Sequence, residues 1–176
     1  NISAMYGMYH GPDGLSEIAG HCQSSASLLR AGLVKLGCNA ADAPYFDTIR
    51  VSPPAGMSVD DVMAAGVQQG VNFRRLSDTE LTLACDETTS VADIEAAWRA
   101  FGGGNVAFTA ADLAAEAKPC ALPASLVRNS TFMEHPVFNT YHSESQMLRC
   151  AADGIGLHCD GICAPFRAGD ASPTWP

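Results

Sequence analysis

A long run of apolar residues spaced three and four apart is the feature that most constrains the fold of this chain. Between Leu15 and Leu36 the run places its apolar side chains on one face of a helix of roughly six turns. An isolated amphipathic helix is marginal in water, so this face needs a neighbouring layer to cover it. Gly37 predicts the end of the helix, and the GPDG stretch at 11–14 predicts a turn before it.

The residues that follow predict the covering layer. YFDTIRV, at 45–51, is typical of a strand, and 72–76 and 80–85 are predicted to form a hairpin. Two more helices are predicted after Ser58 and Ser90, and a short one at 109–118. The expected inward-facing residues are Val59, Val62, Met63 and Val67 in the helix after Ser58, Leu81, Leu83 and Cys85 in the hairpin, and Val91, Ile94, Trp98 and Phe101 in the helix after Ser90. This order predicts an α+β fold, with a small mixed or antiparallel sheet and helices on one face.

Composition narrows the classes of partner and compartment. The 176 residues, 47% hydrophobic and 16% charged, are typical of a globular chain of about one domain. A net charge of −9 argues against nucleic acid and anionic membranes as partners, and no apolar run approaches the ~18 residues of a membrane span. The seven cysteines are odd in number and mostly far apart, which favours a reducing compartment over a disulfide framework.

A polar stretch near the C-terminal end, HPVFNTYHSESQMLR at 135–149, admits two interpretations. Ser143 and Gln146 have the spacing of a capping box, and Glu144 lies in the first turn, where the helix dipole favours a negative charge. A helix start is therefore favoured over a catalytic cluster. Because a helix N-terminus can also bind an anion, Tyr141, His142, Ser143 and Glu144 remain candidate pocket or interface residues.

Three further candidates have structural alternatives. Tyr9 and His10, in MYGMYHGPDG, could line a pocket, although a packed turn is favoured. Arg74 lies beside Arg75 on a predicted strand and could bind a carboxylate, although exposed strand arginines are commoner. In the tail, His158, Cys159 and Cys163 lack a clear fourth metal ligand, so we expect no metal site.

Four stretches resemble one known family in the same order along the chain. They are MYHGPDGL, YFDT, LACDETTS and HPVFNTYHSESQMLR, within residues 1 to 150. They are similar to the P-protein of the glycine cleavage system, a pyridoxal-phosphate enzyme of the aspartate-aminotransferase fold type. The resemblance implies the small C-terminal domain of the first half of that enzyme, followed by the start of the second half. It divides the chain into a small α+β domain at 1–118, a junction with a capped helix at 119–150, and a divergent tail at 151–176.

The resemblance also implies a limit on chemistry. The family carries its cofactor lysine in a His-Lys pair, and neither Lys35 nor Lys118 has that context. We therefore expect pyridoxal phosphate in the parent enzyme, none bound to this chain, and no catalysis by the chain alone.

The expected function is that of a fragment of glycine dehydrogenase (decarboxylating). The implied parent decarboxylates glycine and passes the aminomethyl group to the lipoyl arm of the H-protein. Implied partners are the remainder of the P-protein or a second P-protein chain, in a bacterial cytoplasm or a mitochondrial matrix. The alternative is a non-catalytic binding or assembly domain derived from the same family.

Overall fold

The computed structural model describes residues 2–153, with the side chains of 149–153 left aside. Two compact units divide the chain, and the division falls within its first helix, α1 (Ile2–Lys35). One unit, here called the sheet unit, is Ile18–Arg128. The other, here called the terminal unit, joins the described residues of the two ends of the chain, up to Glu17 and from Asn129.

A four-stranded antiparallel sheet lies at the centre of the sheet unit. Its strands are β1 (Asn39–Ala40), β2 (Thr48–Ser52), β3 (Arg74–Arg75) and β4 (Leu81–Ala84), in the order β1-β2-β4-β3. The hairpin of β3 and β4 is present as predicted, with shorter strands. The predicted strand at 45–51 begins only at Thr48, so Tyr45 lies in the preceding loop. The α+β class with an antiparallel sheet is confirmed.

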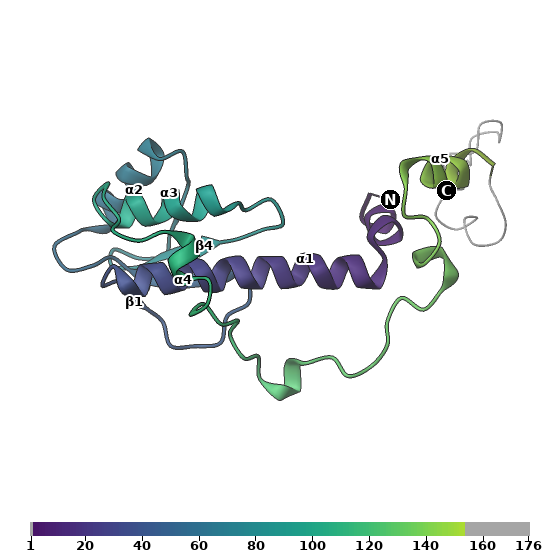
Figure 1. Cartoon of the computed structure of the whole chain (residues 1–176), viewed down its shortest axis with the longest axis horizontal. Helices are drawn as coiled ribbons and strands as arrows, with labels where there is room; N and C mark the ends of the chain where they lie inside the picture. The colour runs from purple at the N-terminus through teal and green to yellow at the C-terminus, as the bar shows by residue number, and fades with distance from the viewer. Residues whose placement is uncertain (1, 154–176) are drawn as a thin grey trace, which may run out of the picture. The chain divides into compact units, whose positions relative to one another are not determined.

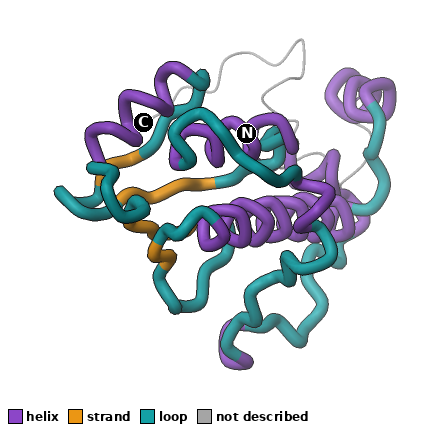
Figure 2. Tube along the Cα trace, turned by 60° about the vertical axis from the view of Figure 1, so that its left-hand side comes forward, coloured by secondary structure: helices purple, strands orange, loops and turns teal. Residues whose placement is uncertain are grey.

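One face of the sheet is buried by helices. Ile49 and Val51 of β2 are at most 2% exposed, whereas Thr48 and Arg50 between them face outward. Leu81, Leu83 and Cys85 share the same buried face, as the alternation predicted. Figures 1 and 2 show the sheet strands lying beside the helices α1, α2 (Val59–Gln68) and α3 (Val91–Phe101). The core of the unit is formed where these helices meet the sheet.

Trp98 is the centre of this core. Its side chain is fully buried, and its indole Nε1 donates a hydrogen bond of 2.9 Å to the carbonyl of Leu29 in α1. A Cβ on Gly32, one turn further along α1, would lie 2.1 Å from the indole ring. The absence of a side chain at Gly32 therefore lets α1 and α3 approach closely.

Short polar motifs begin the helices of the sheet unit. Ser58 and Asp61 form a reciprocal capping box at α2, and Ser90 begins α3 as predicted, with Asp93 as its partner. The hydroxyl of each serine also donates to the aspartate carboxylate at 2.6 Å, and this bond, together with the one from the serine N–H, holds the pKa of both aspartates below its ordinary value. The helix predicted at 109–118 is only α4 (Ala110–Leu113). Gly37, Gly70 and Gly102–Gly104 follow the helices that they were predicted to end.

Two valines predicted to be buried are exposed. Val67 is 69% exposed because the neighbouring Gly66 takes the buried position, against the ring of Phe73. Val91 is 56% exposed because it is the first residue of α3 and helical side chains tilt toward the N-terminus, past the end of the covered face. The predicted turn at 11–14 contains a break at Gly11, but helix lies on both sides of it.

The terminal unit has a much smaller core. Met8 and Val137 are buried against each other, with Phe138, Tyr141 and Met147 packed around them. Val137 and Phe138 belong to a short 3-10 turn, η2 (Pro136–Phe138), and Met147 belongs to α5 (Glu144–Asp153). A second 3-10 turn, η1 (Ala124–Leu126), lies in the sheet unit. The domain boundaries expected at 118 and 150 remain predictions.

Candidate functional site

The polar and aromatic residues near the two ends of the chain gather in the terminal unit. Tyr9 and His10 are in the first turns of α1, with ring centroids 5.2 Å apart and an edge-to-face arrangement. The ring of Tyr6 lies 4.3 Å from that of His10. Tyr9 is 43% exposed and His10 is partly buried, so this cluster has both a packed side and an open side.

Gly11 lets the segment 138–142 pack against this helix. Its backbone has φ 63° and ψ −176°, which interrupts α1 before Pro12. A Cβ at this position would meet the carbonyl oxygen of Phe138 at 2.6 Å and the ring of His142 at 3.0 Å. Glycine therefore fits here for two reasons, since its φ is one that other residues rarely adopt and the space is taken by backbone.

His142 joins the two segments by a hydrogen bond. Its Nδ1 lies 2.8 Å from the carbonyl oxygen of Tyr9. Because a carbonyl can only accept, Nδ1 must carry the proton, and the lone pair of the neutral ring is then on Nε2. The side chain is exposed, so Nε2 of His142 is placed to accept a hydrogen bond from a ligand.

Ser143 begins α5 in a variant of the predicted capping box. Its Oγ accepts from the backbone N–H of Gln146 at 3.4 Å, as the spacing predicted. The side-chain Oε1 of Gln146 accepts at 3.0 Å from the N–H of His142, one residue before the serine. Ser143 also contacts the hydroxyl of Ser145 at 3.4 Å. The helix-start interpretation is confirmed, and these bonds leave Ser143 without a base that could activate it as a nucleophile among the described residues.

The predicted candidates are thus divided between the units. Tyr9, His10, Tyr141, His142, Ser143 and Glu144 all belong to the terminal unit. In that unit Tyr141 packs on the small core, and Glu144 is exposed in the first turn of α5. Whether these residues bind a ligand stays a prediction.

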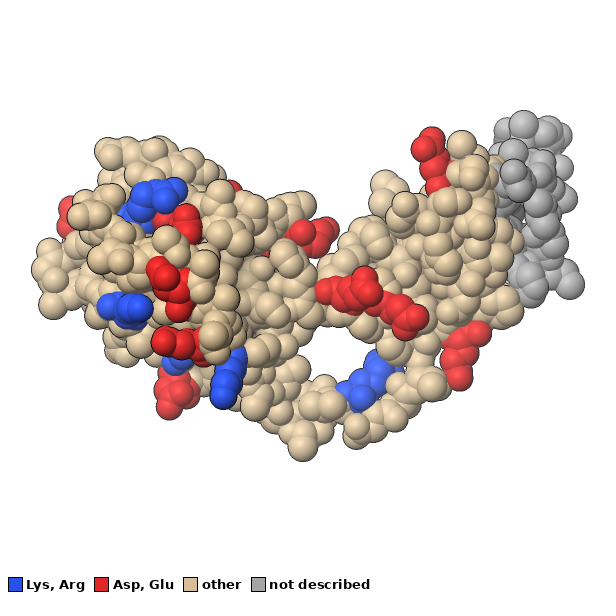
Figure 3. Space-filling view, viewed as in Figure 1, with Lys and Arg blue, Asp and Glu red and all other residues tan. Residues whose placement is uncertain are grey.

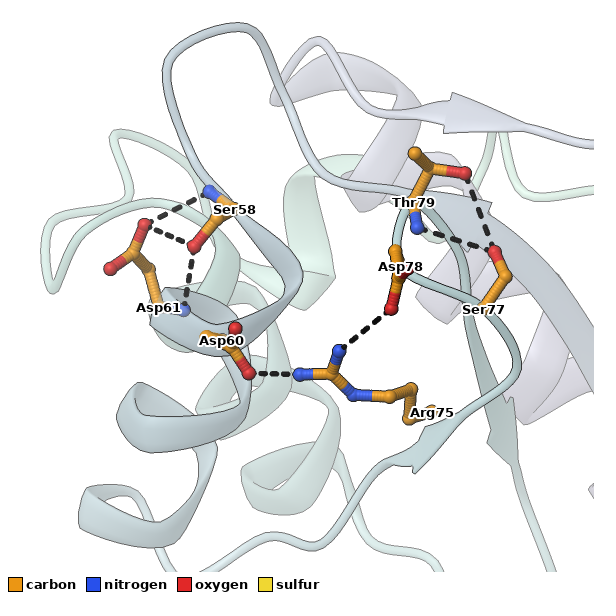
Figure 4. Close-up of polar contacts among 7 residues, drawn as sticks. All are labelled: Ser58, Asp60, Asp61, Arg75, Ser77, Asp78 and Thr79. Carbon is orange, nitrogen blue, oxygen red and sulfur yellow. Dashed lines mark hydrogen bonds and ion pairs between the residues drawn. The ribbon is translucent and has the colours of Figure 1, made fainter.

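Arg74 belongs to the sheet unit, where it is exposed on β3. Its neighbour Arg75 pairs with Asp60 of α2 and with Asp78 of the hairpin turn, as Figure 4 shows. A carboxylate ligand was suggested for this pair of arginines. For Arg75, the carboxylates are those of Asp60 and Asp78 in the same chain.

Metal and cysteine chemistry is limited in the described part of the chain. No group of three or more possible metal ligands occurs among residues 2–153. His158, Cys159 and Cys163 lie outside the described residues. Cys22, Cys38 and Cys85 are buried free thiols, and Cys120 is a partly buried one. Burial raises the pKa of the Cys38 thiol to about 12 and of the Cys85 thiol to about 11, which makes both thiols unreactive near neutral pH.

Sequence reasoning missed one basic residue, Arg30. It lies on the predicted long helix next to the apolar face, and nothing in its spacing distinguishes it from an exposed helical arginine. The structure places it beside Tyr45, with its guanidinium carbon 5.8 Å from the ring centroid. The loop before β2 brings the two together, and no local sequence signal predicts that contact.

Fold and site together define a class of protein: an α+β chain with an antiparallel sheet unit, and a terminal unit in which residues from the C-terminal segment pack on the first turns of α1. The comparisons with known proteins give the family. The model of the glycine cleavage system P-protein family matches residues 1–101, more than half of the chain. The chain belongs to this family.

Relatives from several organisms share this similarity. Glycine dehydrogenase (decarboxylating), mitochondrial, of Pisum sativum is 40% identical over 150 residues, covering 85% of this chain and 14% of the relative. Glycine dehydrogenase (decarboxylating) of a Bradyrhizobium species is 45% identical over 148 residues, covering 84% and 15%. The enzyme of the same name from Vibrio cholerae is 41% identical over 149 residues, covering 85% and 15%. The chain therefore spans about one seventh of the length of these relatives.

Proposed function

We propose that this chain forms one part of a glycine dehydrogenase (decarboxylating) and does not catalyse by itself. The observation that carries the proposal is the coverage: 84–85% of the chain matches only 14–15% of the relatives. The remainder of the P-protein, or a second P-protein chain, would supply the cofactor lysine. The parent enzyme would act with the H-protein, in a mitochondrial matrix or a bacterial cytoplasm.

The described residues do not fit pyridoxal phosphate. A Schiff-base lysine is normally held in a desolvated pocket, whereas both lysines of this chain are exposed. The Nζ of Lys35 lies 4.9 Å from the ring centroid of Phe108, and Lys118 lies in the loop after α4. No step of the parent's reaction is therefore assigned to this chain.

The helix N-termini of the sheet unit also do not favour a phosphate. Ser58 and Ser90, which begin α2 and α3, are each bonded to an aspartate carboxylate. Thr109, which begins α4, is bonded in the same way by Asp112. Each carboxylate occupies the N–H of the capping residue and repels a second anion.

The terminal unit supports the need for a neighbour. Among its described residues only Met8 and Val137 form a buried apolar pair, while Ile2 is 85% and Leu148 is 62% exposed. So small a core contributes little free energy of folding. We propose that this unit packs against the rest of the P-protein, and that its role in the enzyme is to hold the junction in place.

No described helix is long and apolar enough to cross a membrane. Within the described residues, acidic and basic side chains are interspersed on the face of the sheet unit that Figure 3 shows. This mixture gives no extended basic surface there for nucleic acid.

A chimaera tests the proposal. Residues 1–150 of this chain would replace the matching segment of the Bradyrhizobium enzyme, which is 45% identical to it. We expect the chimaera to bind pyridoxal phosphate and to decarboxylate glycine in the presence of H-protein. The isolated chain should release no carbon dioxide from glycine, and borohydride reduction with pyridoxal phosphate should leave Lys35 and Lys118 unmodified.

The control uses the junction itself. Gly11→Ala in the chimaera should lower activity, because its Cβ would meet backbone at 2.6 Å. Gly7→Ala should preserve activity, because its Cβ would meet only side-chain atoms, the flexible end of Met133 at 3.4 Å and the Phe138 ring at 3.8 Å. A folded, cofactor-loaded chimaera without activity would favour the alternative of a non-catalytic assembly domain. Stoichiometric modification of either lysine in the isolated chain would contradict the proposal.

A further inference from the structure

The side chain of Arg30, near the C-terminal end of α1, has a buried donor with no acceptor among the described residues. Its Nε is inaccessible to water and has no hydrogen-bond partner among the described residues. An unsatisfied buried donor costs about 1–3 kcal/mol, so such groups in proteins usually have a structural or functional reason. None of the ion pairs within the described part of the chain uses Arg30.

Two neighbouring pockets share this arginine. One has a volume of about 260 Å³ and the other of about 350 Å³, and both are lined by Arg30, Ala43, Pro44 and Tyr45. The guanidinium lies over the Tyr45 ring, which provides a flat wall at 5.8 Å. All of these residues belong to the sheet unit.

The charge in the pockets is mainly positive, although the whole chain carries −9. Lys118 lines the larger pocket and Arg50 lines the smaller one. Arg50 is paired with Glu80 at 3.2 Å, so Arg30 and Lys118 are the cations left for a ligand. Asp42 also lines the larger pocket, but no described ion pair joins it to either cation.

A chain of hydrogen bonds fixes the walls of the larger pocket. The Tyr45 hydroxyl donates to Ser27 Oγ at 3.3 Å, and Ser27 donates to the carbonyl of Gln23 at 2.8 Å. The side-chain amide of Gln23 donates to the carbonyl of Cys120 at 3.0 Å. These three hydrogen bonds thus connect the Tyr45 ring, through α1, to the segment that follows Lys118.

We propose that this pocket binds a small organic carboxylate. The planar guanidinium of Arg30 matches a carboxylate, Lys118 adds a second positive charge, and Ala43, Pro44 and the Tyr45 ring cover a short apolar body. The carboxylate would contact the part of the Arg30 side chain that lines the pocket, while the Tyr45 ring, held by Ser27, remains the flat wall. The inference does not depend on the proposed function, because it uses residues of the sheet unit alone.

Titration of the whole chain with sodium propionate tests the inference. Propionate carries a carboxylate and a short apolar body but no amine or phosphate. At constant ionic strength, we expect saturable changes in the backbone amide resonances of residues 42–45 and 118–121. Arg30→Gln should weaken binding by about tenfold or more, since it removes a charge-assisted hydrogen bond. Arg74→Gln, which removes the same charge from an exposed strand position, should bind as the unchanged chain does.

Each remaining outcome decides the inference. Equal saturation in Arg30→Gln, or changes that never saturate, would overturn it. Saturation with inorganic phosphate but not with propionate would overturn the assignment to a carboxylate. If Arg30→Gln does not fold, Lys118→Gln at its exposed position is the deciding variant: weaker propionate binding supports the site, and unchanged binding overturns it.

Discussion

At the scale of single residues, two glycines of α1 have opposite roles. Gly32 is in contact with Trp98, and an added Cβ would lie 2.1 Å from the indole. Gly20 lies in the same helix with nothing within 4 Å of its added Cβ. We expect Gly32→Ala to lower the free energy of unfolding by about 1–3 kcal/mol through overpacking. Gly20→Ala should raise it by about 0.5–1 kcal/mol, because alanine favours the helix.

Urea unfolding at unchanged slope measures both changes. Equal effects of the two substitutions would show that Gly32 does not hold α1 close to Trp98. Because both variants change glycine to alanine within one helix, helix propensity alone cannot produce opposite signs.

The buried thiol of Cys38 makes the free energy of unfolding depend on pH in the alkaline range. Burial raises the pKa of its thiol from 9.0 to about 12 in the folded chain, so above about pH 9 the unfolded chain loses a proton that the folded chain retains. The contribution of the protonated Cys38 thiol to the free energy of unfolding is fully present below pH 9 and is lost as the pH rises toward 12. We expect the free energy of unfolding to fall across this range, and to fall less steeply in Cys38→Ala. An unchanged slope in that variant, measured by unfolding at a series of pH values, would contradict the assignment.

At the scale of elements, α5 depends on its first residues. Ser143 Oγ satisfies the N–H of Gln146, so Ser143→Ala should lower the free energy of unfolding of the terminal unit by about 0.5–2 kcal/mol. Ser143→Asp should be nearly neutral, because a carboxylate accepts the same bond. Ser145→Ala, two residues further along the chain, is the control and should have a smaller effect. Hydrogen exchange of the backbone amides of residues 146–148 measures the stability of the terminal unit directly. Equal and large losses of stability in Ser143→Ala and Ser143→Asp would indicate that the hydroxyl itself is needed.

Elements of the sheet unit could be predicted because local signals agree with its packing. Ser58 with Asp61 gave the start of α2, and the alternation of Leu81 and Leu83 gave the buried face of β4. The exposed Val67 could not be predicted, because the pattern does not show that Gly66 would contact Phe73. Sequence placed Tyr9 and His142 on separate segments. Their hydrogen bond depends on the break at Gly11, which local spacing does not reveal.

At the scale of the whole molecule, the family explains why so much of the chain is shared with so little of its relatives. The matches cover 84–85% of the chain, and they correspond to about one seventh of each relative. The described residues contain a well-packed sheet unit and a lightly packed terminal unit. In the proposed function, the first folds as a domain and the second depends on contacts outside this chain.

Exposed apolar side chains of the terminal unit lead to the last prediction. The segments 5–9 and 129–138 of this unit are rich in apolar residues, and the burial of Met8 against Val137 covers some of them. Several large apolar side chains of the unit remain exposed, namely Ile2, Tyr6, Tyr9, Phe132 and Leu148. Exposed apolar surface that gathers in one region usually marks an interface. We therefore expect the isolated chain to self-associate or to bind a hydrophobic dye.

The double variant Ile2→Ser, Leu148→Ser should weaken self-association by roughly tenfold or reduce dye binding, because it removes two of these apolar side chains. Val67→Ser is the control, since Val67 is 69% exposed in the sheet unit and its loss should have no such effect. Sedimentation at several concentrations, with dye fluorescence on the same samples, measures both quantities. A monodisperse monomer that binds no dye would show that the terminal unit is closed, and an independent domain would then account for the chain better than a part of a larger enzyme.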